Sequence, residues 1–254
     1  MLLSSTEINA PKQANTHAAS QHSPQHPTRE TIILATNLNK SVGSGEHVLH
    51  ILRDLELQIQ AGERVAIVGS SGSGKSTLLG ILAGLDVPTS GLVSIQGNAF
   101  STLDEDARAA MRGQTMGFVF QSFQLLPTMT ALENVMIPMQ LNGHPTPMQT
   151  AQESLAKVGL AERMQHYPKQ LSGGEQQRVA IARAFAAQPA VLFADEPTGN
   201  LDTANGEKII ELLFKLNQEN STTLVLVTHD IRLAQRCDRV LTLQDGQLSE
   251  KAYA

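Results

Sequence analysis

The sequence contains one cysteine, no tryptophan and no apolar run that approaches the roughly 20 residues of a bilayer-crossing helix. Because Cys237 is alone, an intramolecular disulfide is impossible, which fits a reducing compartment. We interpret this residue as a small core side chain. The N-terminus lacks the apolar block of a signal peptide. We therefore expect a chain that neither spans a membrane nor is secreted.

An excess of basic residues is also lacking. Nineteen Lys and Arg stand against 24 Asp and Glu, which gives a formal net charge of −5. A groove for DNA or RNA normally shows a basic excess, because neutralisation of phosphates supplies most of that affinity. We expect no nucleic-acid partner.

Large apolar side chains are nearly absent from residues 1–29. Such a segment cannot bury enough surface to offset its ordering entropy, so we predict a disordered tail. Its three histidines, His17, His22 and His26, are spaced too loosely for a preformed metal site. From residue 30 to about 250 the composition is that of one folded domain, without an internal repeat.

Short apolar runs within this domain predict strands. They cover residues 31–34, 55–59, 64–68, 191–194 and 223–227, and a turn-prone segment covers 41–46. A helix is predicted over 75–83, with Gly84 ending it. Strands that alternate with helical segments indicate an α/β domain with a parallel sheet.

A glycine-rich segment lies between the strand at 64–68 and the helix at 75–83. It fits G-x-x-x-x-G-K-[ST], the P-loop pattern, and comprises Gly69, Ser70, Ser71, Gly72, Ser73, Gly74, Lys75, Ser76 and Thr77. Glycines let backbone N–H groups curl around an anion at a helix start. Lys75 suits terminal phosphates and catalysis, and the Ser76 hydroxyl suits Mg²⁺. The alternative is a flexible Gly/Ser loop with an unrelated lysine.

Two carboxylates, Asp195 and Glu196, end the apolar run at 191–194. Ligands of open α/β sheets bind beyond the carboxyl ends of strands, so both should face the phosphates. Asp195 suits Mg²⁺, and Glu196 suits accepting a proton from an attacking water. The alternative is an acidic helix start.

A second helix start follows Leu171, with the residues Ser172, Gly173, Gly174 and Glu175. Ser172 and Glu175 form a capping box in this spacing. Two glycines in the first turn weaken a helix but expose N–H groups at its positive end, which favours an anion. The alternative is an ordinary capped helix.

With these motifs in this order, residues 30–249 resemble the ABC ATPase family. The resemblance implies a RecA-like P-loop NTPase core with a parallel sheet, an N-terminal antiparallel β-subdomain and a helical subdomain inserted at about 122–175. It identifies 171–175 as the signature sequence, Gln121 as the Q-loop residue, which contacts Mg²⁺ and water and senses the membrane partner, and Asp202 as the D-loop aspartate. By the same likeness, His229 contacts the γ-phosphate.

The resemblance also implies how the chain works. ATP and Mg²⁺ would lie between the P-loop of one copy and the signature of a second copy in a head-to-tail homodimer. A separate integral membrane permease would hold the dimer on the cytoplasmic face of the cell membrane. Family members usually stack an aromatic side chain on adenine, and Val42 stands at that position here, which predicts weaker nucleotide binding.

Residues 118–135 and 193–202 are similar to the lipoprotein-release and macrolide-export branch of the family, and 40–47 to one type of transporter ATPase from Gram-negative bacteria within it. This branch implies export or extraction of a lipophilic substrate. An alternative within the same branch is a signalling or mechanotransmitting ATPase that moves nothing. A ribosome or DNA-repair factor is disfavoured, because a second cassette or a long coiled-coil insert is lacking.

Overall fold

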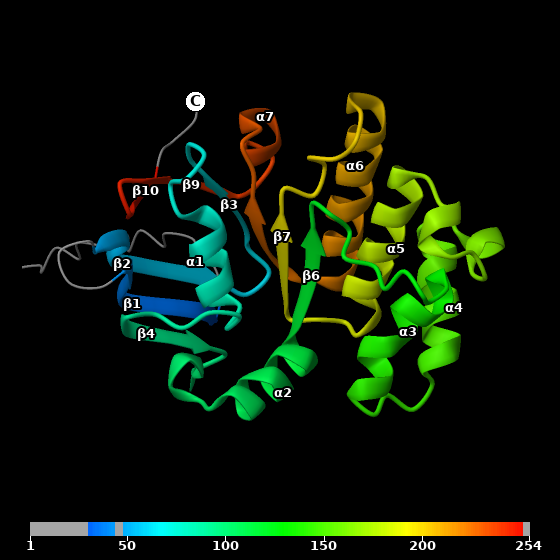
Figure 1. The fold of residues 1–254 in the computed structure, drawn as a ribbon, viewed down its shortest axis with the longest axis horizontal. Helices are drawn as coiled ribbons and strands as arrows, with labels where there is room; N and C mark the ends of the chain where they lie inside the picture. Colours follow the sequence, from blue (N-terminus) through cyan, green and yellow to red (C-terminus); the bar gives the residue numbers. More distant parts are fainter. Residues whose placement is uncertain (1–29, 44–47, 251–254) are drawn as a thin grey trace, which may run out of the picture.

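The computed structural model describes residues 30–43 and 48–250. Two β-sheets and the helices around them make up the described part of the chain (Figure 1). The disordered tail predicted for residues 1–29 lies outside it.

The N-terminal sheet is antiparallel, with the strand order β2-β1-β4-β5. Its strands are β1 (Thr31–Val42), β2 (Leu49–Gln60), β4 (Ser90–Ile95) and β5 (Asn98–Ala99). The turn predicted for 41–46 is wrong for its first two residues, because Ser41 and Val42 pair with His50 and Leu49 in the β1–β2 hairpin. Residues 44–47 of that segment are outside the described part.

The central sheet has the strand order β10-β9-β3-β8-β7-β6. Its strands are β3 (Arg64–Val68), β6 (Met116–Phe120), β7 (Val191–Asp195), β8 (Thr223–Val227), β9 (Arg239–Gln244) and β10 (Gln247–Glu250). All neighbours are parallel except β9 and β10, which form an antiparallel hairpin at the edge. The parallel sheet is thus confirmed, and the hairpin adds one antiparallel strand that the sequence patterns did not predict.

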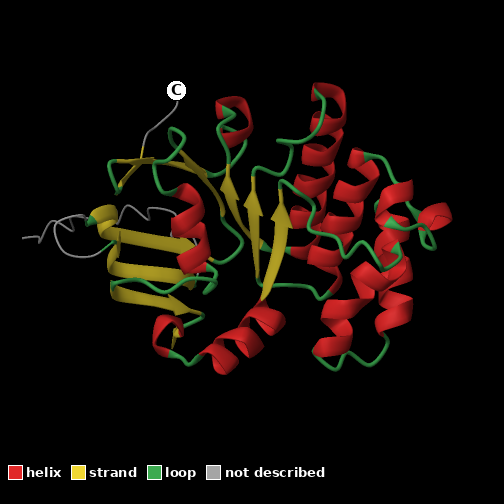
Figure 2. Ribbon diagram, in the orientation of Figure 1, coloured by secondary structure: helices red, strands yellow, loops and turns green. Residues whose placement is uncertain are grey.

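The α-helices are α1 (Lys75–Leu82), α2 (Glu105–Thr115), α3 (Ala131–Leu141), α4 (Pro147–Lys157), α5 (Gly173–Ala186), α6 (Thr203–Asn220) and α7 (Ile231–Ala234). Short 3₁₀ turns are η1 (Phe100–Thr102), η2 (Ala161–Arg163) and η3 (Pro168–Gln170). In Figure 2, α1 lies between the two sheets, and the helices α3 to α6 gather on the other side of β6 and β7. Helices α3 and α4 fall within 122–175, where the family resemblance places an inserted helical subdomain.

The central sheet is buried on both faces. In β7, Val191 and Phe193 pack into the core shared with α1 and the antiparallel sheet, whereas Leu192 and Ala194 pack into the core shared with α3 to α6. Successive side chains of a strand point to opposite faces, so a continuous apolar run is what a strand between two layers requires. The loops at the carboxyl ends of these strands are left at the edge of the sheet.

Cys237 packs against the core, and burial raises the pKa of its thiol to about 12. This placement agrees with a packing role for the side chain. Among residues 30–43 and 48–250, no helix combines the length and the hydropathy of a membrane span.

Candidate functional site

The glycine-rich loop connects β3 to α1 and has the backbone that the motif predicts. Gly74 precedes α1 with φ 98, a left-handed conformation that favours glycine, and in the described structure no side chain caps this helix start. A Cβ at Gly69 would lie 2.4 Å from the carbonyl oxygen of Leu243, so a larger residue would not fit there. The Lys75 ammonium donates to the carbonyls of Gly69 and Ser70, both at 2.9 Å. Because no described side chain caps α1, the N–H groups of its first turn are available to an anion.

A pocket of about 700 Å³ lies beside this loop. Residues 69–73 line it together with the start of β2 and the β9–β10 turn. The Ser73 hydroxyl is buried and has no hydrogen-bond partner within the described residues, which fits a polar ligand at this loop. Val42 is 43% exposed and pairs across the hairpin with Leu49, which lines the pocket. The position predicted to face adenine is thus next to the pocket.

Asp195 ends β7 within hydrogen-bond reach of the loop. The Ser76 hydroxyl donates to Asp195 Oδ2 at 3.3 Å. Burial raises the pKa of Asp195, and the neighbouring charge of Glu196 raises it further, while Ser76 and Lys75 oppose the shift. A hydroxyl and a carboxylate at this distance are oxygen donors of the kind that Mg²⁺ takes, so these residues fit that ion.

Glu196 and His229 meet because their strands are parallel neighbours. Asp195 pairs with Val227, so the residues that follow β7 and β8 emerge side by side. His229 Nδ1 lies 2.8 Å from Glu196 Oε1. The backbone of Glu196 has φ 46, and its N–H donates to the Val227 carbonyl at 2.9 Å. A left-handed non-glycine residue at a strand end is a strained arrangement of the kind found at active sites.

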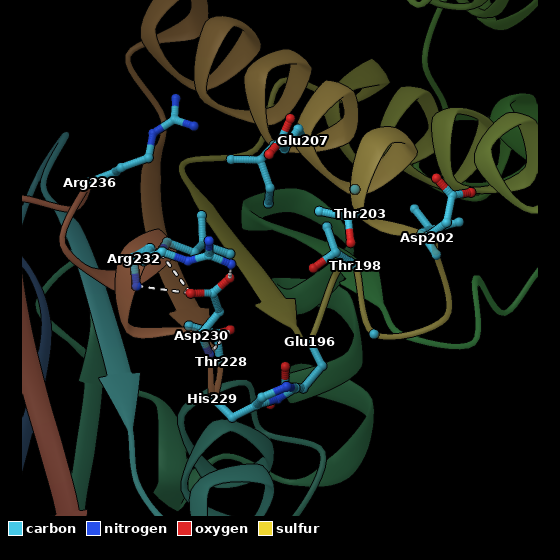
Figure 3. Close-up of a pocket in the computed structure, with 15 residues that line it drawn as sticks. Glu196, Thr198, Asp202, Thr203, Glu207, Thr228, His229, Asp230, Arg232 and Arg236 are labelled. Carbon is cyan, nitrogen blue, oxygen red and sulfur yellow. Dashed lines mark hydrogen bonds and ion pairs between the residues drawn. The ribbon is translucent and has the colours of Figure 1, made fainter.

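These two side chains belong to a pocket of about 460 Å³ (Figure 3). The Glu196 side chain is 18% exposed, whereas that of His229 is 75% exposed. Asp202 lines the other end of the same pocket, where its carboxylate caps α6 by accepting from the Asn205 N–H at 3.0 Å. That hydrogen bond, together with one from the Asn205 side chain, lowers the pKa of Asp202. Of the acid pair expected from sequence, Glu196 therefore faces the pocket that Asp202 also lines.

Gln121 follows β6 and reaches the same edge of the sheet, since Phe120 pairs with Asp195. Its amide Nε2 donates to Asn200 Oδ1 at 3.2 Å, and Asn200 Nδ2 donates to the Gln121 carbonyl at 3.0 Å. A Cβ at Gly199 would lie 2.7 Å from Gln121 Nε2, so glycine leaves the space that the glutamine occupies. The structure thus brings Gln121 to residues 200–202, the D-loop, which end in Asp202.

The helix start at Ser172 is capped as predicted. Its hydroxyl accepts from the Glu175 N–H at 3.3 Å, and Glu175 Oε2 accepts from the Ser172 N–H at 2.8 Å. The N–H groups of Gly173 and Gly174 stay at the tip of α5, because the first turn of a helix has no partners for them. The pocket beside the P-loop contains no signature residue, and α5 lies across β6 and β7 from α1 (Figure 1). The two helix starts that the sequence predicts to bind anions therefore do not converge within one chain.

Three polar contacts near the site were not predicted. Gln177 is fully buried and donates to the Pro197 carbonyl at 2.6 Å, Arg183 donates to the Gln124 carbonyl at 2.6 Å, and Asn134 holds the loop that precedes α3. For Arg183 a signal existed, because it is a charge within the small apolar run that follows the signature. Nothing local marks Gln177 or Asn134, since their partners are distant in sequence or in a loop.

Comparisons with known proteins agree with this geometry. The family model described as "ABC transporter" matches residues 52–199. The Escherichia coli protein called "Uncharacterized ABC transporter ATP-binding protein YbbA" is 57% identical over 225 residues, 88% of this chain and 99% of that protein. YbbA is also the type that residues 40–47 resemble. The "Lipoprotein-releasing system ATP-binding protein LolD" of Hydrogenovibrio crunogenus is 49% identical, over 85% of this chain and 95% of that protein.

Two known structures of the cassette MJ0796 have similar folds. One is described as a dimeric, post-hydrolysis state bound to ADP and Pi, and the other as a dimeric bacterial ABC transporter cassette. Each has a TM-score of 0.79 and covers 87% of this chain and 100% of the other, at 42% and 43% identity. The chain therefore belongs to the ABC transporter family, as an ATP-binding cassette subunit that hydrolyses ATP.

Proposed function

We propose that this cassette works as a homodimer that closes around ATP and drives a separate integral membrane permease. The observation that carries the proposal is the separation of two helix starts in one chain. The P-loop and the signature tip both suit phosphate, yet the chain does not bring them together. A second copy, packed head to tail, would place its signature over the P-loop of the first. The dimeric structures of MJ0796 support this arrangement.

In this dimer, Lys75 and the N–H groups at the start of α1 hold the phosphates. Ser76 and Asp195, with Gln121, would hold Mg²⁺, which neutralises charge on the phosphates when bound. Glu196 accepts the proton of the attacking water, and its hydrogen bond to His229 orients the carboxylate. His229 is exposed enough to reach the γ-phosphate. Ser172, Gly173 and Gly174 of the second copy receive the same phosphate from the other side.

The test of this mechanism is Glu196→Gln. The amide cannot take a proton, so we expect ATP binding to persist, hydrolysis to fall by about a hundredfold or more, and an ATP-bound dimer to accumulate. Light scattering measures the dimer and phosphate release measures turnover. Glu219→Gln, the same change at an exposed residue near the end of α6, should behave as the wild type. Wild-type turnover in Glu196→Gln would remove Glu196 as the base.

We further propose that the permease exports or extracts a lipophilic substrate, because LolD proteins are described as parts of lipoprotein-releasing systems. The permease would hold the dimer on the cytoplasmic face of the membrane. A groove of about 450 Å³, lined by residues of α2, β6, α3 and α5, offers a place for a permease helix. Gln124 and Leu126 line this groove and belong to residues 121–126, the Q-loop, which would connect the permease to Gln121.

The second candidate function is signalling or mechanotransmission without transport. It shares the same branch of the family, and the same site serves it. Reconstitution with the co-purified membrane protein separates the two, because only a transporter moves substrate between vesicle and solution in proportion to ATP hydrolysis. Purification of the chain from membranes without any integral membrane protein would exclude a permease partner.

A further inference from the structure

The turn that follows Gln121 is strained. The Gln124 N–H donates to the Ser122 carbonyl at 2.6 Å, which closes a three-residue turn around Phe123. Phe123 has φ 60 and Gln124 has φ 48, so two consecutive non-glycine residues are left-handed. A γ-turn whose central residue has positive φ is the rare, strained form. Such a turn persists only if surrounding groups hold it.

Arg183 of α5 is the group that holds this turn. Its Nη1 donates to the Gln124 carbonyl at 2.6 Å and its Nη2 donates to the Phe123 carbonyl at 3.0 Å. Burial lowers the pKa of this guanidinium, and among the described residues no carboxylate pairs with it. A planar fork of N–H donors matches two oxygens at fixed spacing, which an ammonium cannot do. The two carbonyls are thus its hydrogen-bond partners in the described structure.

The turn also positions the Phe123 ring and the preceding residue, Gln121, against other parts of the site. A Cβ at Gly173 would lie 3.7 Å from Phe123 Cζ and 3.4 Å from Leu201 Cδ2, so the Phe123 ring sits beside the signature tip and the D-loop. On the N-terminal side, Gln121 is joined to Asn200 by two hydrogen bonds. The far half of the loop is fixed separately by the buried amide of Asn134, which bonds to both the N–H and the carbonyl of Leu126.

We propose that Arg183 is a positioning residue for ATP hydrolysis, which keeps the strained Q-loop turn in place and thereby sets Gln121 and the Phe123 ring. The proposal rests on the role proposed above for Gln121. Gly173 and Arg183 are ten residues apart on one helix, about 15 Å along its axis. A helix moves as a rigid element, so ATP that draws the signature tip toward a partner copy also moves the guanidinium that holds the Q-loop.

The first test is Arg183→Met in the full-length chain. Methionine keeps the aliphatic stem and removes both hydrogen bonds, so we expect kcat to fall about tenfold while KM for ATP changes less than about threefold. Arg183 does not line the pocket beside the P-loop, which is why binding should be spared. Arg183→Lys can reach one carbonyl at a time and should lie between the two. Arg64→Met is the matched control, because Arg64 is a partly buried arginine at the end of β3 that lies away from the P-loop. This substitution should change stability without changing kcat.

The second test is rescue. Glycine takes positive φ without strain, so adding Gln124→Gly to Arg183→Met should recover part of the lost kcat. A purely structural role of Arg183 in packing α5 predicts no such rescue. Wild-type kcat in Arg183→Met, or a loss that Gln124→Gly leaves unchanged, would overturn the proposal.

Hydrogen exchange separates this proposal from the proposed function. In Arg183→Met, or in Arg183→Lys if methionine prevents folding, amides 122–126 should exchange faster while those of β8 stay protected. Unchanged exchange at 122–126 would refute the role of Arg183 directly. If Gln121→Ala hydrolyses ATP as the wild type does, the role of Gln121 fails instead, and the exchange result still reports on the turn.

Discussion

At the scale of single residues, strained backbone is found where the chemistry is expected. Glu196 has φ 46, which costs a non-glycine residue about 1–2 kcal/mol. Its N–H bond to Val227 and its carboxylate bond to His229 offset that cost. Other left-handed residues, such as Gln96 and Asp245, lie in hairpin turns where the next residue is glycine. Glu196 instead begins a turn, in which its carbonyl accepts from the Gly199 N–H at 3.0 Å, and the residue after it is proline and not glycine. Its left-handed backbone sets the direction in which the carboxylate leaves β7.

Val42 allows a prediction at this scale. The side chain is exposed at the end of β1 and pairs with a residue that lines the P-loop pocket. An aromatic ring there would stack on the base and add about 1–3 kcal/mol. We expect Val42→Tyr to lower the Kd for ATP by at least about fivefold in a calorimetric titration. Val42→Ile, which enlarges the side chain without a ring, should change little. An unchanged Kd in the tyrosine variant would show that this position does not face the base.

At the scale of elements, the start of α5 combines two requirements that conflict. Glycines at its first two positions weaken the helix, and the capping box of Ser172 and Glu175 compensates. Glu175 also pairs with Arg163 at 3.3 Å. Glu175 accepts hydrogen bonds from the Ser172 N–H and from the Ser172 hydroxyl. These two bonds, the backbone one having the larger effect, lower the pKa of Glu175 below its ordinary value of 4.5. The helix tip thus stays ordered while its N–H groups remain open.

The cap can be tested by Ser172→Ala without nucleotide. Loss of the cap should lower the free energy of unfolding by roughly 1 kcal/mol in urea. The folded pKa of Glu175 is depressed, so its contribution is complete above the unfolded value of 4.5 and is lost as pH falls through the folded pKa. The difference between variant and wild type should therefore be constant at neutral pH and shrink below 4.5. A difference that grows in acid would contradict this account.

At the scale of the whole molecule, the two helix starts proposed to bind phosphate lie on different sides of β6 and β7 (Figure 1). In the proposed head-to-tail pair, each chain would supply half of each of two composite sites. Gln121, Asn200 and Asp202 lie at or near the same sheet edge as Glu196, so a partner that approaches this edge meets all of them. If two copies share each site, a defect in the P-loop of one chain and a defect in the signature of another should complement each other.

Two defective chains should complement each other. Lys75→Ala should lose nucleotide binding, whereas Gly173→Asp keeps its own P-loop but repels phosphate at the signature tip. With Glu196→Gln in both chains to stop hydrolysis, neither should dimerise alone in ATP. Mixed, they form one intact site from the P-loop of the Gly173→Asp chain and the signature of the other. Light scattering should show dimers only in the mixture, and dimers of either variant alone would argue against the shared site.

Much of the site could be predicted from sequence because its parts are local. The loop from Gly69 to Ser76, the capping box at Ser172 and the acids that end β7 each depend on a few consecutive residues and on the backbone geometry of a strand end or helix start. The buried strands β3 and β8 were visible for the same reason, since continuous apolar runs are what two covered faces require. Family resemblance added Gln121, Asp202 and His229.

Tertiary structure alone decided how these parts meet. Gln121 and Asn200 are 79 residues apart, and Arg183 and Gln124 are 59 apart, so no local pattern specifies either contact. The strand order β3-β8-β7-β6 brings the ends of β6, β7 and β8 together, and only this packing joins Glu196 to His229. Short motifs, and the family resemblance that they carry, predicted that the chain binds and hydrolyses ATP, because each motif lies within a few consecutive residues. Which side chains hold the catalytic loops was settled by packing, because the contacts form only when distant segments are buried against one another.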